Sequence, residues 1–156
     1  VVVEAGRVVE EGPARDVLVR PRSAFAARAA GLNLVPGTAA PEGLRCADGS
    51  LLVGLRDGGC EPGEDAVAVF APAAVAVHRG APGGSPRNAL AVVVAELEPR
   101  GPLVRVRAAR AGHLPSGLAA DVTAAAVADL DLAPGSAVRF VVKATEVAVH
   151  AAGRAS

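Results

Sequence analysis

The sequence predicts a mainly β fold in which two small β-modules follow a short mixed α/β segment. After residue 31, short runs of Val, Leu and Ala alternate with turn residues, and the chain holds 18 Gly and 12 Pro. This spacing is typical of β-rich folds. The hydrophobic fraction is 51% but the aromatic fraction is only 2%. The core must therefore consist of Val, Leu and Ala around three Phe.

The first 31 residues predict the mixed α/β segment. Strands are expected over 1–4 and 7–10, and helices over 14–20 and 24–30. Ala5-Gly6 supplies hairpin chemistry between the strands. Pro13 suits the first position of a helix, and Pro21 ends that helix because it excludes the helical conformation at the residue before it. Ser23 is a good cap for the second helix, and Gly31 is a good stop.

The remaining residues predict strands joined by Gly- and Pro-containing turns. Strands are expected near 33–40, 50–55, 65–70, 74–79, 89–97, 102–109, 117–122, 137–143 and 146–150. The alternation in 103–107 places Val104 and Val106 inside and Arg105 and Arg107 outside. One later helix is expected over 124–130, with Thr123 as its cap.

Two stretches of the chain repeat each other. Pro62-Gly63 matches Pro134-Gly135 at a separation of 72 residues, and Val75-Ala76-Val77-His78 matches Val147-Ala148-Val149-His150 at the same separation. Two landmarks with one separation indicate an internal duplication. The sequence therefore predicts modules over 32–79 and 84–152, the second enlarged by the helix after Thr123.

Composition and motifs exclude several function classes. The 16 basic residues balance the 16 acidic ones, which disfavours a nucleic-acid or membrane-surface binder. No apolar run reaches the roughly 20 residues that span a bilayer, so no membrane insertion is expected. No secretory signal is present, which favours a cytoplasmic location. The two cysteines are expected to be ordinary reduced thiols, and the absence of Met indicates a piece of a longer protein.

Catalytic and metal-binding motifs are also missing from the sequence. There is no phosphate loop, no nucleophile elbow and no metal constellation. His78 and His150 occupy matching strand ends and are expected at the rims, while His113 lies in a Gly/Pro loop. We therefore expect neither an enzyme nor a cofactor in this chain.

The densest polar cluster opens the second module, where Gly83-Gly84 precedes Ser85, Arg87 and Asn88. Two glycines allow backbone N–H groups to turn toward a ligand, and the three side chains supply hydrogen-bond donors for a small oxyanion. The alternative is a hairpin entry in which Asn88 bonds to its own turn. On this pattern alone the hairpin entry is the favoured interpretation.

Lys143 is the second candidate. It follows the apolar residues 140–142, where an ammonium group needs a partner or access to an anion. Its counterpart in the first repeat is Ala71. The alternatives are a lysine that extends into solvent or one that pairs with Glu146. Strand alternation would place residues 143 and 146 on opposite faces, which disfavours the pairing.

These clusters resemble a known family. The run Glu4-Ala5-Gly6-Arg7-Val8-Val9-Glu10-Glu11-Gly12-Pro13, with Val17-Leu18, Pro21, Phe25 and Gly31-Leu32-Asn33-Leu34, resembles the end of the ATPase domain of bacterial ABC importers. Ser85-x-Arg87-Asn88 and Lys143-Ala144-Thr145-Glu146-Val147 resemble the two signatures of the molbindin, or TOBE, domain of molybdate importers. Together the resemblance covers nearly the whole chain.

The resemblance implies two OB-like β-barrel modules after a remnant of an ABC ATPase domain at 1–31, with the second module binding molybdate or tungstate between subunits. Carried over residue by residue, the oxyanion contacts fall on Ser85, Arg87, Thr123 and Lys143, with Asn88 shaping the opening turn. The chain departs from the family pattern at Pro86, which removes one N–H donor, and at Ala126, where the family often has a hydroxyl. The first module lacks both signatures, so the resemblance gives it a structural role.

The leading interpretation is the C-terminal, substrate-sensing and dimerising region of a molybdate-type importer ATPase. This chain would not hydrolyse ATP, and it would meet the transporter permease through the absent ATPase domain at the inner face of the plasma membrane. One alternative is a substrate-blind dimerisation module of an importer for another solute. The other is a free-standing molybdate storage protein. Self-association is expected because small barrels with thin cores expose strand edges.

Overall fold

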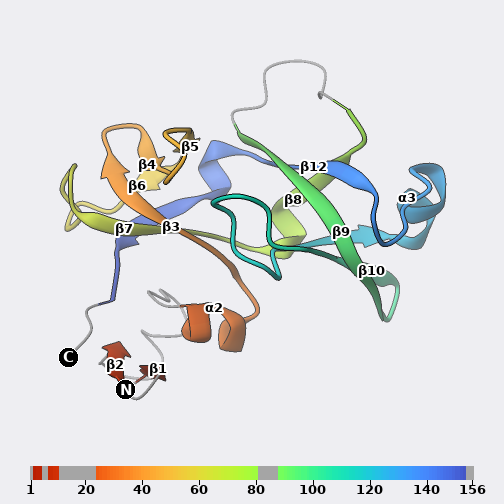
Figure 1. Ribbon diagram of the computed structural model, residues 1–156, viewed down its shortest axis with the longest axis horizontal. Helices are drawn as coiled ribbons and strands as arrows, with labels where there is room; N and C mark the ends of the chain where they lie inside the picture. Colours follow the sequence, from red (N-terminus) through yellow and green to blue (C-terminus); the bar gives the residue numbers. More distant parts are fainter. Residues whose placement is uncertain (1, 5–6, 11–23, 81–87, 154–156) are drawn as a thin grey trace. The chain divides into compact units, whose positions relative to one another are not determined.

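The computed structural model describes residues 2–4, 7–10, 24–80 and 88–153. The chain forms two compact units, one of residues Val1–Phe70 with Val147–Ser156 and one of residues Ala71–Glu146. Both units consist mainly of β-strands, as Figure 1 shows, and the predicted mainly β fold with two small modules is confirmed. No helix among the described residues has the length and apolar character to cross a membrane.

The segment before residue 31 begins with an antiparallel strand pair, β1 (Val2–Glu4) and β2 (Arg7–Glu10). Helix α2 (Ala24–Ala30) follows and ends at Gly31, whose positive φ of 72° suits glycine. Ala26 and Ala27 give the helix a buried face. The predicted strands and second helix are confirmed here, whereas the predicted helix over 14–20 lies outside the described residues.

The first unit contains a small barrel. Its strands are β3 (Asn33–Ala40), β4 (Gly43–Arg45), β5 (Leu51–Val53), β6 (Leu55–Arg56), β7 (Asp65–Phe70) and β13 (Ala148–Ala151). They pair in the order β5-β4-β3-β7-β13-β6. The two ends of this order are joined in the chain by Gly54 alone, so the sheet closes on itself. A Cβ on Gly54 would lie 2.8 Å from the Val147 side chain, which explains the glycine at the closure.

Strand β4 was not predicted from the sequence, because Gly43-Leu44-Arg45 is too short to show an alternating pattern. The predicted strand over 50–55 is divided at Gly54 into β5 and β6. Leu44 and Leu52 from these short strands are buried in the barrel core together with Val35.

The second unit contains the longer strands. Its elements are the 3-10 turn η1 (Pro72–Ala74), β8 (Val75–His78), β9 (Asn88–Arg100), β10 (Leu103–Ala108), β11 (Ala119–Thr123), α3 (Ala124–Asp129), β12 (Ala137–Val142) and the 3-10 turn η2 (Ala144–Glu146). The sheet order is β11-β10-β9-β12-β8, and β11 packs against β8 and η1. Phe140 and Val142 of β12, Val94 of β9 and Val106 of β10 are fully buried between the strands.

The internal duplication is visible in both units. Strand β12 repeats β7, and η2 repeats η1, each at the separation of 72 residues found in the sequence. The last strands are exchanged, however. Strand β8, from the first repeat, pairs with β12, whereas β13, from the second repeat, pairs with β7. The compact units therefore differ from the sequence modules 32–79 and 84–152 at the final strand of each.

Two details of side-chain placement differ from the sequence predictions. Arg105 and Arg107 lie on the outer face as expected, but both are half-buried in ion pairs, Arg105 with Asp121 at 2.8 Å and Arg107 with Glu98 at 2.9 Å. The hydrogen bond from Arg105 lowers the pKa of Asp121 below its ordinary 3.8. His150 is not a rim residue, because it is 3% exposed and its strand is covered on both edges by β6 and β7.

The cysteines behave as predicted. Cys46 and Cys60 are both free thiols and both buried. Burial raises the pKa of each thiol. A thiol with a raised pKa holds less of the nucleophilic thiolate near neutral pH.

Candidate functional site

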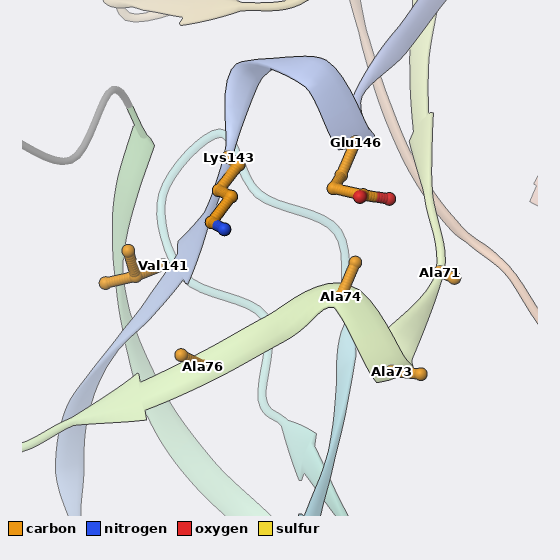
Figure 2. A pocket seen from close by; sticks show the side chains of 7 residues that line it. All are labelled: Ala71, Ala73, Ala74, Ala76, Val141, Lys143 and Glu146. Atoms are coloured by element: carbon orange, nitrogen blue, oxygen red, sulfur yellow. The ribbon is translucent and has the colours of Figure 1, made fainter.

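Lys143 lines an open pocket of about 460 Å³ in the second unit. The other lining residues are Ala71, Ala73, Ala74, Ala76, Val141 and Glu146. Most of these residues are small and apolar, so the ammonium and the carboxylate are the only charged groups of the lining. Figure 2 shows Lys143 beside Val141 and Ala76, while Glu146 lies toward Ala71 on the other side.

The prediction that Lys143 lies inside an apolar strand is wrong. Strand β12 ends at Val142, and Lys143 is exposed at the start of the 3-10 turn η2. The ammonium therefore needs no buried partner. Among the described residues it forms no ion pair within 4.0 Å. A cation that is exposed but set in a concave surface is available to an anionic ligand.

The predicted separation of Lys143 and Glu146 was also wrong. The turn η2 replaces strand alternation, with the Glu146 N–H donating to the Lys143 carbonyl at 2.9 Å, and both side chains line the same pocket. The sequence held a signal for this turn. Pro72 begins the matching turn η1 in the first repeat, and a helical turn there predicts one at 144–146 through the duplication.

Asn88 lies beside this pocket region at the start of β9. Its register partner is Val142, the residue before Lys143, and Asn88 is 3% exposed. Asn33 occupies the matching place in the first unit, where it is equally buried and pairs in register with Phe70. Since the first module lacks the lysine, a buried Asn common to both modules fits the turn-shaping role better than ligand contact.

Thr123 caps helix α3 as predicted. Its hydroxyl oxygen accepts a hydrogen bond from the Ala126 N–H at 3.1 Å, and the residue is exposed. A hydroxyl that accepts one bond keeps its own O–H to donate. Thr123 therefore has a donor available for a ligand at the surface.

Thr123 and Lys143 lie far apart in one chain. Asn88, next to the Lys143 end of β12, is the first residue of β9. Thr123 pairs in register with Leu103, and Leu103 pairs with Arg100, the last residue of β9. Thirteen strand residues at about 3.3 Å each separate the two ends of β9. Figure 1 likewise shows α3 at the opposite end of β12 from η2.

Ser85 and Arg87 fall outside the described residues, so they stay predictions from the sequence. The chain resumes at Asn88, next in sequence to Arg87. Of the predicted contacts, the structure thus brings Asn88 and Lys143 together and places Thr123 at the other end of the sheet.

The outer face of this sheet has two parts. Over β10, β11 and the second half of β9 it carries ion pairs, and the hydrogen bond from Arg107 lowers the pKa of Glu98 there. Over β8, β12 and the first half of β9 it carries mostly Ala and Val. We call this second part the alanine face; its cross-strand rows are Ala76–Val141–Ala89, His78–Arg139–Ala91 and Ala137–Val93. Val93 is 40% exposed.

Comparisons with known proteins agree with the resemblance seen in the sequence. Residues 84–149 match the TOBE domain family. The chain is 49% identical over 152 residues to "Molybdenum import ATP-binding protein ModC" of two Mycobacterium tuberculosis strains, CDC 1551 / Oshkosh and ATCC 25618 / H37Rv. The alignment covers 97% of this chain and 41% of each relative, so the chain spans less than half the length of these relatives.

A solved structure supports the fold. The cytoplasmic molybdate-binding protein ModG, in a crystal form with molybdate bound, superposes with a TM-score of 0.64 at 24% sequence identity. The superposition covers 76% of this chain and 95% of that one. At this identity the likeness concerns the fold. The sequence matches identify residues 84–149 as a TOBE domain in a chain that is similar over 97% of its length to molybdenum import ATP-binding proteins.

Proposed function

We propose that this chain is the oxyanion-binding C-terminal region of a molybdate-type ABC importer ATPase. The observation that carries the proposal is Lys143, exposed in a pocket of the unit that contains most of the TOBE match. The 49% identity to ModC supports the identity of the parent protein, and the fold shared with molybdate-binding ModG supports molybdate as the ligand. The parent would work at the cytoplasmic face of the membrane with a permease, and this region would report ligand occupancy to it.

The donor set suits a tetrahedral dianion. Molybdate and tungstate offer only hydrogen-bond acceptors, and Lys143, Thr123, Ser85 and Arg87 offer donors. Glu146 is the one lining group that repels a dianion. It lies toward Ala71 in the pocket (Figure 2), so the ion would approach Lys143 from the side of Val141 and Ala76.

A second copy of the chain completes the site in this proposal. Thr123 and Lys143 lie at opposite ends of β9 and β12, so one small ion does not reach both within one chain. Val141 and Ala76 belong both to the pocket and to the alanine face. A copy seated on the alanine face would therefore cover the pocket of Lys143 and could bring its own Thr123 to it.

Ligand-dependent thermal stability tests the proposed function. Molybdate and tungstate should raise the melting temperature of the chain, because a ligand that binds only the folded state stabilises it. Sulfate at the same ionic strength should raise it less. Equal shifts with all three anions would indicate a general salt effect and would contradict a specific site. The absence of any shift would favour a substrate-blind module.

A charge on the alanine face should prevent self-association. We expect the unsubstituted chain to be dimeric or larger in light scattering at micromolar concentration. Val93→Glu places a carboxylate at an exposed position of the alanine face and should shift the mass to that of a monomer, with weaker molybdate binding. Leu55→Glu, at a 61% exposed position in the first unit, is the matched control and should keep the mass unchanged. A monomeric unsubstituted chain, with and without molybdate, would refute this part of the proposal.

A further inference from the structure

Arg79 connects two distant parts of the second unit. It directly follows β8, and its guanidinium donates from Nε to the Leu130 carbonyl at 2.8 Å and from Nη2 to the Asp131 carbonyl at 2.6 Å. Nη2 also lies 3.5 Å from the Ser136 hydroxyl. Leu130 is the C-terminal cap of α3. The side chain thus bonds the end of α3 across about 50 residues of sequence.

Helix α3 has few other means of holding its position. It has six residues, none of them buried. A helix this short is not stable by its own backbone bonds. The carbonyls of Ala126, Val127 and Ala128 accept hydrogen bonds from the N–H groups just after the helix. The carbonyls of Leu130 and Asp131, which follow the helix, accept charge-assisted hydrogen bonds from the Arg79 guanidinium. Asp131, which follows the cap, has a positive φ of 50°, a conformation that Asp adopts more readily than most residues other than glycine.

Thr123 directly precedes α3, at the end of the helix opposite to Leu130. Strand β11 holds the backbone of Thr123, but a shift of α3 would change the orientation of the Thr123 hydroxyl, because that hydroxyl accepts a hydrogen bond from the Ala126 N–H inside the helix. We infer that Arg79 is a positioning residue of the oxyanion site: it fixes α3, and thereby Thr123, without touching the ligand. This inference rests on the proposed function. Arg79 directly follows β8, the strand that the first repeat contributes to the second unit. The exchange of strands therefore supplies the oxyanion site with a positioning residue.

Calorimetric titration with molybdate tests the inference. Arg79→Gln removes the charge and the forked donor, and should weaken binding about three- to tenfold. Arg79→Lys keeps the charge but not the fork, and should bind with intermediate affinity. Arg107→Gln is the matched control. It also loses a charge and its bonds to Glu98 and Gly117, but far from α3, and should bind as the unsubstituted chain does.

Two further readouts separate positioning from direct contact and from general destabilisation. The dependence of affinity on salt should be unchanged in Arg79→Gln but shallower in Lys143→Gln, because Lys143 faces the ion and Arg79 does not. In a double-mutant cycle, Arg79→Gln should not lower the affinity for molybdate further when Thr123→Val is already present, because the effect of Arg79 passes through Thr123. Hydrogen exchange should rise in 124–131 alone.

Equal affinity of Arg79→Gln and the unsubstituted chain, or full additivity with Thr123→Val, would overturn the inference and leave the proposed function standing. No binding of molybdate by the unsubstituted chain would overturn both. If Arg79→Gln does not fold, the double-mutant cycle with Thr123→Val is measured with Arg79→Lys instead, and the same outcomes apply.

Discussion

Replacing Lys143 by Gln is expected to weaken molybdate binding about ten- to a hundredfold. Gln keeps most of the length and one donor but removes the charge, and the loss of one charge-assisted contact corresponds to roughly 1.5–3 kcal/mol. The melting temperature of the unliganded chain should hardly change, because Lys143 is exposed and has no ion-pair partner among the described residues. Calorimetric titration beside thermal melts measures both quantities.

Arg110→Gln is the matched control for this change. Arg110 is an exposed basic residue of the same unit and does not line the pocket. Its replacement removes one positive charge from the same unit, so it reports the effect of net charge on the attraction of a dianion. Affinities that fall equally in Lys143→Gln and Arg110→Gln would show that Lys143 acts only through net charge.

A charge placed in β8 or in β13 is expected to destabilise the unit that the strand joins, and not the module in which its own repeat lies. Val77 in β8 and Val149 in β13 occupy the same position of an identical Val-Ala-Val-His tetrapeptide, and both are buried. Val77 pairs with Phe140, whereas Val149 pairs with Ala68. Val77→Asp should therefore destabilise the barrel of 88–142 and Val149→Asp that of 33–70, each by several kcal/mol, about the cost of a buried unpaired charge.

Hydrogen exchange followed residue by residue distinguishes the two barrels. Each variant is the control for the other, since the substitution and its local sequence are the same. Loss of protection over 33–70 in Val77→Asp, with 88–142 still protected, would contradict the exchange of the strands.

Much of the fold followed from local pattern. Strands β3 and β7 and helix α2 have the predicted bounds, because Gly and Pro mark their ends and apolar residues fill them. The exchange of β8 and β13 could not be predicted. The two strands share one tetrapeptide, so the residues do not specify which barrel each one joins. Pairing between distant strands is decided by the path of the chain, here through η1 and η2.

The site was predicted less completely than the fold. Spacing identified Lys143 but assigned it to the wrong environment, because the strand was expected to continue one residue further. Alternation then misplaced Glu146, which a 3-10 turn brings into the same pocket. No sequence pattern pointed to Arg79, because its partners are two backbone carbonyls 51 and 52 residues away, and a backbone carbonyl leaves no trace in the residue types. The distance between Thr123 and Lys143 could not be predicted, because it depends on the register of three strand pairs, β10–β11, β9–β10 and β9–β12.

Lys143 is the only lysine of the chain, because the other 15 basic residues are arginines. Dimethylation with ¹³C-formaldehyde keeps its charge and gives one lysine signal, with the chain's α-amino group as an internal reference. Molybdate added at fixed ionic strength should move the lysine signal along a saturable curve, at lower concentration than sulfate does and with the reference unmoved. A lysine signal that stays in place while calorimetry records molybdate binding would contradict the assignment of Lys143 to the oxyanion site.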